Sequence, residues 1–142
     1  MTTNDYNTQE LLGETARNNP NKEARLAALE KITDEAILKE FAKDDPYRQA
    51  RIMAIGKITD ERFLAKIAKN DSNGQARESA VENIQDKALL VEIARTDSHP
   101  SVRKAAVGKI DDEAILAKIA KKDSNKAVQK AARERIRNIS SP

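Results

Sequence analysis

Apolar and polar positions along this chain follow a pattern that recurs every 26 residues, five times over. One motif of the pattern reads Lys31-Ile32-Thr33-Asp34, then Lys57-Ile58-Thr59-Asp60, Asn83-Ile84-Gln85-Asp86 and Lys109-Ile110-Asp111-Asp112. A short unit that repeats without insertions is typical of a solenoid, in which each repeat buries its apolar face by stacking on its neighbours. Solenoids are mostly recognition surfaces, so the pattern favours binding over catalysis.

Each repeat is predicted to contain two antiparallel helices of about ten residues, and residues 34–58 show why. The apolar side chains of Ile37, Leu38, Phe41 and Ala42 fall on one helical stripe after Asp34, which suits an N-cap. A turn at 44–46, which ends in proline, breaks the first helix. Ala50, Ala54, Ile55 and Ile58 then form the stripe of a second helix.

The same apolar columns recur in the other repeats. The first-helix core is Leu11-Leu12-Ala16, Ile37-Leu38-Phe41-Ala42, Phe63-Leu64-Ile67-Ala68, Leu89-Leu90-Ile93-Ala94 and Ile115-Leu116-Ile119-Ala120. The second-helix core is Ala24-Ala28-Leu29-Ile32, Ala50-Ala54-Ile55-Ile58, Ala76-Ala80-Val81-Ile84, Val102-Ala106-Val107-Ile110 and Val128-Ala132-Ile136. Helices this short are marginal alone in water, so stacking must order them.

We therefore expect an all-α chain of ten helices in one curved, right-handed layer. One domain covers 8–136, with repeats at 8–32, 34–58, 60–84, 86–110 and 112–136 and flexible tails at 1–7 and 137–142. Thr15 and Arg133 replace apolar residues of the central repeats, as terminal repeats with one wet face require. This indicates a complete solenoid.

The turn into the second helix carries the most specific signature. Asp97-Ser98-His99-Pro100-Ser101-Val102-Arg103-Lys104-Ala105-Ala106 resembles the motif of the HEAT-repeat family of α-solenoids (HEAT-like, armadillo-type). The aspartate and arginine recur six positions apart as Asp45/Arg51, Asp71/Arg77 and Asp97/Arg103, and more weakly as Asn19/Arg25 and Asp123/Gln129. The resemblance implies second helices that line a concave, partner-binding side, and it implies no activity.

The arginines of these pairs have two interpretations. A helical wheel at about 100° per residue places Arg51 inside the buried arc, where a charge needs partners, and the turn aspartates of the same and adjacent repeats can supply them. We therefore interpret Asp45, Arg51, Asp71, Arg77, Asp97 and Arg103 as a structural ladder. The alternative is a basic ladder that binds phosphates.

Composition narrows the classes of function. The chain has 26 bases and 23 acids, 3% aromatic residues and no cysteine, so a global basic field is weak and disulfides and thiolate sites are excluded. Without a leader or a long apolar run, we expect a cytoplasmic monomer that binds no membrane, cofactor or metal.

Other candidate sites have simpler explanations. His99 and the turn that starts at Asp71 are predicted to be surface turn residues, not a catalytic base and a calcium loop. The basic columns at the helix ends (Arg17, Lys43, Lys69, Arg95, Lys121; Lys31, Lys57, Lys109, Arg135) suit the helix dipole and are expected to face solvent. Because HEAT-like DNA glycosylases and chromophore lyases exist, an enzyme is a third class of function. No acid–base pair or aromatic pocket in the sequence supports catalysis, and we expect no enzymatic activity.

The outward positions of the second helices differ most between repeats. Leu26, Ile52 and Met53 form an apolar group, and Lys104 and Lys130 are basic. We expect a non-catalytic scaffold that binds a helix or peptide of another protein, with the first three as an apolar anchor and the lysines steering acidic partner residues. Packing of the apolar three between neighbouring helices is the other possibility.

Two further features of the chain leave alternatives open. Gly56 and Gly108 indicate either close approach of a partner or sequence drift. Residues 121–137 carry seven bases against two acids, so binding of nucleic acid or another polyanion through Lys126, Lys130 and Arg133 is the alternative function.

Overall fold

The computed structural model describes residues 2–142, and over this range the chain forms ten α-helices and no strand. The helices are α1 (Thr3–Asn18), α2 (Lys22–Lys31), α3 (Glu35–Asp44), α4 (Arg48–Lys57), α5 (Glu61–Asn70), α6 (Gly74–Asn83), α7 (Lys87–Thr96), α8 (Pro100–Val107), α9 (Glu113–Lys122) and α10 (Lys126–Ser140). The all-α class and the ten helices are confirmed. Their regular spacing is consistent with a helical repeat.

The sequence sets the start of each first helix through an aspartate. Asp34, Asp60, Asp86 and Asp112 are the N-caps of α3, α5, α7 and α9, and each side chain accepts the backbone N–H three residues on. The second helices use other caps, such as Asn73, whose Oδ1 lies 3.1 Å from the Ala76 nitrogen. Each cap satisfies a donor that a helix start would otherwise leave open.

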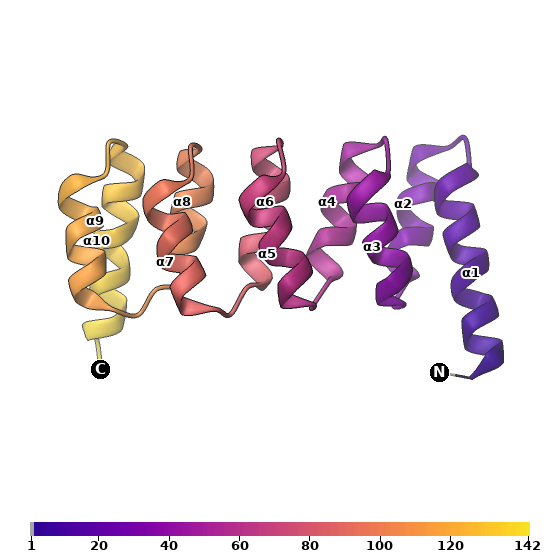
Figure 1. The fold of residues 1–142 in the computed structure, drawn as a ribbon, viewed down its shortest axis with the longest axis horizontal. Coiled ribbons are helices and arrows are strands. Elements are labelled where there is room, and N and C mark those ends of the chain that lie inside the picture. The colour runs from indigo at the N-terminus through magenta and orange to yellow at the C-terminus, as the bar shows by residue number, and fades with distance from the viewer. Residues whose placement is uncertain (1) are drawn as a thin grey trace. The chain divides into compact units, whose positions relative to one another are not determined.

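The chain divides into two compact units, of which one ends at Thr59 and the other is Asp60–Pro142. In the N-terminal unit α1 packs on α2 and α3 on α4, with further contacts between α1 and α3 and between α2 and α4. In the C-terminal unit the pairs are α5 with α6, α7 with α8 and α9 with α10, and α8 contacts both α6 and α10. Within each unit the turns inside the pairs lie at one edge and the linkers between repeats at the other (Figure 1). That both units form one continuous domain over 8–136 stays a prediction.

The core is built from small residues of the second helices, as the apolar columns predict. Ala54, Ala80, Ala106 and Ala132 are all fully buried. Because alanine adds little volume, neighbouring helices can approach closely, and larger aliphatic residues such as Leu64 and Leu116 fill the space beside them.

Leu11 departs from its predicted place in the first-helix core. Its side chain is 64% exposed, whereas Ile37, its counterpart in the next repeat, is buried. The predicted cap residue Thr15 is exposed on the same helix.

Both terminal helices extend into the segments predicted as tails. Residues 3–7 are helical because Thr2 and Asp5 form a reciprocal capping box at the start of α1. Residues 137–140 continue α10, and Ser140 Oγ donates to Glu113 Oε1 at 2.8 Å. The terminal helices therefore run into the predicted tails, and the domain bounds at 8 and 136 stay a prediction.

Gly108 is the C-cap residue of α8 and lies just outside the helix. A Cβ built at this residue meets only the carbonyl oxygens of Ala105 and Lys104, at 3.5 and 3.8 Å, which are ordinary contact distances. Packing within the chain therefore does not require glycine here.

Candidate functional site

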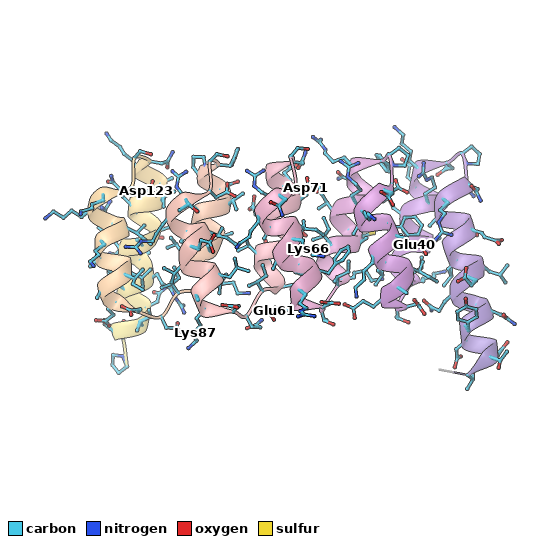
Figure 2. The ribbon with its side chains drawn as sticks, in the orientation of Figure 1. Glu40, Glu61, Lys66, Asp71, Lys87 and Asp123 are labelled. Atoms are coloured by element: carbon cyan, nitrogen blue, oxygen red, sulfur yellow. The ribbon has the colours of Figure 1, made fainter. Side chains whose placement is uncertain are left out.

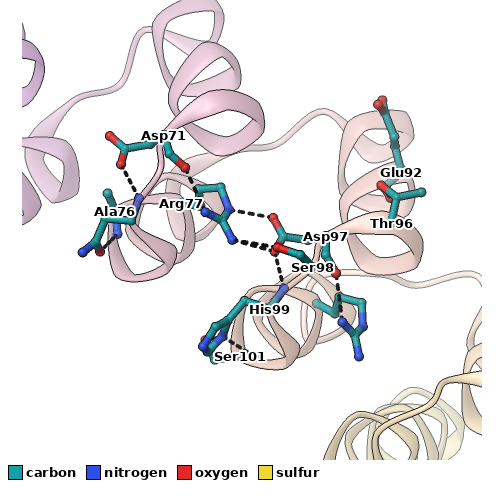
Figure 3. A network of polar contacts seen from close by, with 11 residues as sticks. Asp71, Ala76, Arg77, Glu92, Thr96, Asp97, Ser98, His99 and Ser101 are labelled. Carbon is teal, nitrogen blue, oxygen red and sulfur yellow. Dashed lines mark hydrogen bonds and ion pairs between the residues drawn. The ribbon is translucent and has the colours of Figure 1, made fainter.

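The turn edge of the C-terminal unit holds a ladder of buried ion pairs (Figure 3). Arg77 Nε and Nη2 donate to the two carboxylate oxygens of Asp97 at 2.8 and 3.0 Å. Arg77 Nη1 donates to the backbone carbonyl oxygen of Asp71 at 2.8 Å. One arginine therefore ties its own turn to the turn of the next repeat.

The same arrangement recurs at the next step of this unit. Arg103 donates to the Asp123 carboxylate at 2.9 and 3.0 Å and to the Asp97 carbonyl oxygen at 2.8 Å. Gln129, one repeat after Arg103, makes only the bond to the backbone of its own turn: its Nε2 donates to the carbonyl oxygen of Asp123 at 2.6 Å.

The N-terminal unit contains a looser version of the ladder. Arg51 Nη1 donates to the carbonyl oxygen of Asp45 at 2.8 Å. Arg25 Nη2 lies 3.4 Å from both carboxylate oxygens of Asp45, and its Nε donates to the carbonyl oxygen of Ala16 at 2.8 Å. The bond between an arginine and the aspartate six positions before it therefore uses the backbone oxygen, and the carboxylate partner belongs to the next repeat.

The two bidentate pairs, Arg77 with Asp97 and Arg103 with Asp123, favour the charged forms of both partners. Burial raises the pKa of the Asp97 carboxyl, but hydrogen bonds from Arg77 and from the His99 backbone N–H outweigh it and leave the pKa below its ordinary value. Asp123 behaves in the same way with Arg103. The hydrogen bond to the carboxylate raises the pKa of each arginine despite its burial. All three guanidinium nitrogens of Arg77 donate to internal acceptors, which favours a structural role over phosphate binding.

The opposite edge holds lysines that bind the ends of neighbouring helices. Lys109 Nζ donates to the carbonyl oxygens of Val81 and Glu82, at the end of α6, at 3.2 and 2.7 Å. Burial lowers the pKa of Lys109, and nearby glutamates only partly offset this effect. In the N-terminal unit, Lys57 Nζ donates likewise at the end of α2. These lysines were predicted to face solvent at their own helix ends. They are instead half-buried and cap the preceding second helix.

The linkers between repeats are held by a second set of bonds. In the C-terminal unit, Glu61 Oε1 accepts the backbone N–H groups of Gln85 and Asp86 at 2.5 and 2.6 Å. Lys87 occupies the equivalent position one repeat later, at the same edge of the unit (Figure 2). Over the residues described, the N–H groups of Asp111 and Asp112 consequently have no such acceptor.

The predicted anchor residues lie in the N-terminal unit. Leu26 is on α2, and Ile52 and Met53 are on α4, which contacts α2, so these side chains belong to one layer. All three are half-buried, and within residues 2–142 the large apolar side chains classed as exposed are Tyr6 and Leu11 of α1. Part of the anchor surface is therefore covered by intramolecular packing.

The predicted steering residues lie in the C-terminal unit. Lys104 is exposed on α8 and Lys130 on α10, and these two helices are in contact. Lys130 Nζ lies 3.8 Å from Glu134 Oε1, and both side chains are largely exposed. Lys126 and Arg133, assigned to polyanion binding, are exposed on α10 as well.

His99 and its neighbours cap a helix. The His99 side chain accepts the backbone N–H of Ser101 at 3.2 Å, and Ser101 Oγ lies 2.8 Å from the same Nδ1. Ser101 is a nucleophile beside His99 that the sequence alone did not indicate. However, Nδ1 is already the acceptor that starts α8, and His99 is exposed, so the pair matches a helix cap and not a catalytic dyad.

The turn at Asp71 has its oxygens engaged locally. Asp71 Oδ1 accepts the Asn73 N–H at 2.8 Å, and the Asn73 side chain caps α6. Among residues 2–142 no group of three or more His, Asp or Glu side chains is arranged to hold a metal ion. No helix in that range has the length and apolarity needed to cross a membrane.

Comparison with family models, curated proteins and solved structures finds no match to this chain. The resemblance to HEAT repeats therefore rests on the turn sequence and the repeat itself.

Proposed function

We propose that this protein is a non-catalytic scaffold, a right-handed HEAT-like solenoid whose second helices bind a helix or extended peptide of a partner protein. The observation that carries the proposal is a contrast between inward and outward positions. The inward bonds, Arg77 to Asp97 and Arg103 to Asp123, repeat from one repeat to the next. The outward second-helix positions change from Leu26-Ala27-Glu30 and Ile52-Met53-Gly56 to Glu78-Ser79-Glu82, Lys104-Ala105-Gly108 and Lys130-Ala131-Glu134.

Such a contrast suits a framework that carries a variable recognition face. In the N-terminal unit, Leu26, Ile52 and Met53 would supply apolar contact area. Their half-burial restricts the side chains before binding, so less rotamer entropy is lost on association. In the C-terminal unit, the exposed Lys104 and Lys130 would attract acidic partner residues.

The first test is affinity capture from the native cell, with mass spectrometry and a nucleic-acid readout of the same eluate. The captured protein is then titrated against an Ile52→Glu, Met53→Glu double variant. We expect at least a tenfold loss of affinity, about 1.4 kcal/mol, because two carboxylates would be desolvated in an apolar contact.

A matched control places the same two charges on the first helices of the same unit, as Thr15→Glu and Ala36→Glu, where both parent residues are exposed. This control should bind like the parent. Circular dichroism melts establish that both double variants fold. Undiminished binding by the Ile52→Glu, Met53→Glu variant, or an equal loss in the control, would refute the apolar anchor.

A further inference from the structure

The other layer of the C-terminal unit contains a basic groove between α7 and α9. The groove has a volume of about 310 Å³ and is lined by Ala94, Arg95, Lys118, Ile119, Lys122 and Asp123. It therefore belongs to the first helices and lies at the turn edge, away from Lys104 and Lys130 of the second helices.

The cations of this groove are not neutralised within the chain. Arg95, Lys118 and Lys122 are exposed, and among residues 2–142 none of them takes part in an ion pair. Two bases of α10 differ in this respect, because Lys130 lies near Glu134 and Arg135 pairs with Asp111. Three unpaired cations from α7 and α9 therefore line one groove.

The acidic residues near the groove are already engaged. The Asp123 carboxylate accepts two bonds from Arg103 and one from the Asn125 backbone N–H. Glu92, one turn before Arg95 on α7, lies 3.4 Å from Lys69 Nζ. An anion that enters the groove thus meets three free cations and one carboxylate whose charge is compensated.

We propose that this groove binds the phosphate backbone of double-stranded nucleic acid. Backbone recognition fits because the C-terminal unit has a single aromatic residue, Phe63, which lies outside the groove, so base stacking has no support there. A membrane surface fits less well, because within residues 2–142 the exposed large apolar side chains are Tyr6 and Leu11, and both belong to α1. The proposal goes beyond the scaffold function, and it places anion binding on residues other than Lys126, Lys130 and Arg133.

The test is fluorescence anisotropy with a labelled 20-base-pair DNA duplex and the full chain. If three phosphates are contacted, the slope of log K against log salt is about −2.7, so affinity falls about 40-fold between 50 and 200 mM salt. The triple variant Arg95→Gln, Lys118→Gln, Lys122→Gln should lose at least tenfold in affinity at 50 mM salt and show a slope near zero.

The control variant removes the same charge elsewhere in the unit, as Arg62→Gln, Lys66→Gln and Lys87→Gln, which are exposed residues outside the groove. It should bind the duplex within about threefold of the parent. If both variants lose the same affinity for the duplex, net charge alone explains the binding and the groove proposal is wrong. Tighter binding to phosphatidylserine vesicles or polyglutamate than to the duplex, or no duplex binding by the parent at 50 mM salt, would also overturn it. Unchanged partner binding by the groove variant separates this result from the scaffold proposal.

Discussion

The two edges of the C-terminal unit differ in how strictly their bonds repeat. At the turn edge, Arg77 and Arg103 make the same three bonds, each to its own turn and to the carboxylate of the next. At the linker edge, Glu61 binds two backbone N–H groups, whereas Lys87 stands in the same position one repeat later and accepts nothing. One edge is kept regular and the other is not.

Burial accounts for the difference. Arg77 and Arg103 are 9% and 8% exposed, so the loss of either would leave a poorly hydrated carboxylate without its partner. The linker residues Asp111 and Asp112 are exposed, so water can replace a missing acceptor at small cost. The bond that recurs in successive repeats is thus the buried one, whose loss water cannot compensate.

The largest expected effect is the removal of a ladder arginine. Arg77→Ala should lower the free energy of unfolding by about 1–3 kcal/mol, because it deletes a bidentate charged bond and leaves Asp97 unpaired. Urea denaturation measures the change. Arg62→Ala is the matched control, since Arg62 is an exposed arginine of the same unit, and it should change stability by less than about 0.5 kcal/mol. Equal stabilities of the two variants would remove the distinction between the edges.

Acid should weaken the turn edge selectively. Burial raises the pKa of the Asp97 carboxyl, but the bonds from Arg77 and His99 lower it by more. In the folded state this pKa therefore lies below the ordinary 3.8. Its contribution is therefore complete above about pH 5 and is lost as the pH falls through 3.8 to the folded pKa.

An Asp97→Asn variant tests this dependence by urea denaturation between pH 7 and pH 2. We expect it to be less stable than the parent at pH 7, with a difference that narrows as the pH falls, because the parent loses its carboxylate too. A difference that is constant with pH would show that the charge of Asp97 contributes nothing to the ladder.

The helices could be predicted from the sequence because their signals are local. The apolar stripe at 37, 38, 41 and 42 and the cap at Asp34 lie within one helix, and the structure confirms both. The sequence could not show in the same way which aspartate carboxylate each ladder arginine binds. Arginine follows an aspartate by six positions and precedes another by 20, and both spacings inherit the same 26-residue period. Periodicity alone cannot tell which pair shares a carboxylate.

The contacts that the sequence reasoning missed depend on how neighbouring helices are offset along their axes. The sequence predicts Lys109 as a residue at the end of its own helix. Only the packing of α8 against α6 brings its amine to the carbonyl oxygens of Val81 and Glu82.

The smallest expected effect comes from restoring the missing acceptor at the linker edge. Lys87→Glu should raise the free energy of unfolding by about 0.5–1 kcal/mol, because the new carboxylate can accept the N–H groups of Asp111 and Asp112 as Glu61 does one repeat earlier. An acidic residue also suits the first turn of α7 better than a lysine does, so part of the gain comes from the helix dipole.

Ala88→Glu isolates the dipole effect, because Ala88 is exposed in the same turn but does not occupy the position of Glu61. We expect Lys87→Glu to exceed it in stability and to shift the amide proton resonances of Asp111 and Asp112 downfield, while Ala88→Glu leaves them in place. If the two variants are equally stable and neither moves these resonances, water holds the linker amides as well as a carboxylate does. In that case the bonds at Glu61 would add nothing to the free energy of unfolding, and the polar stabilisation between repeats would come from the turn ladder and from Lys109 at the end of α6.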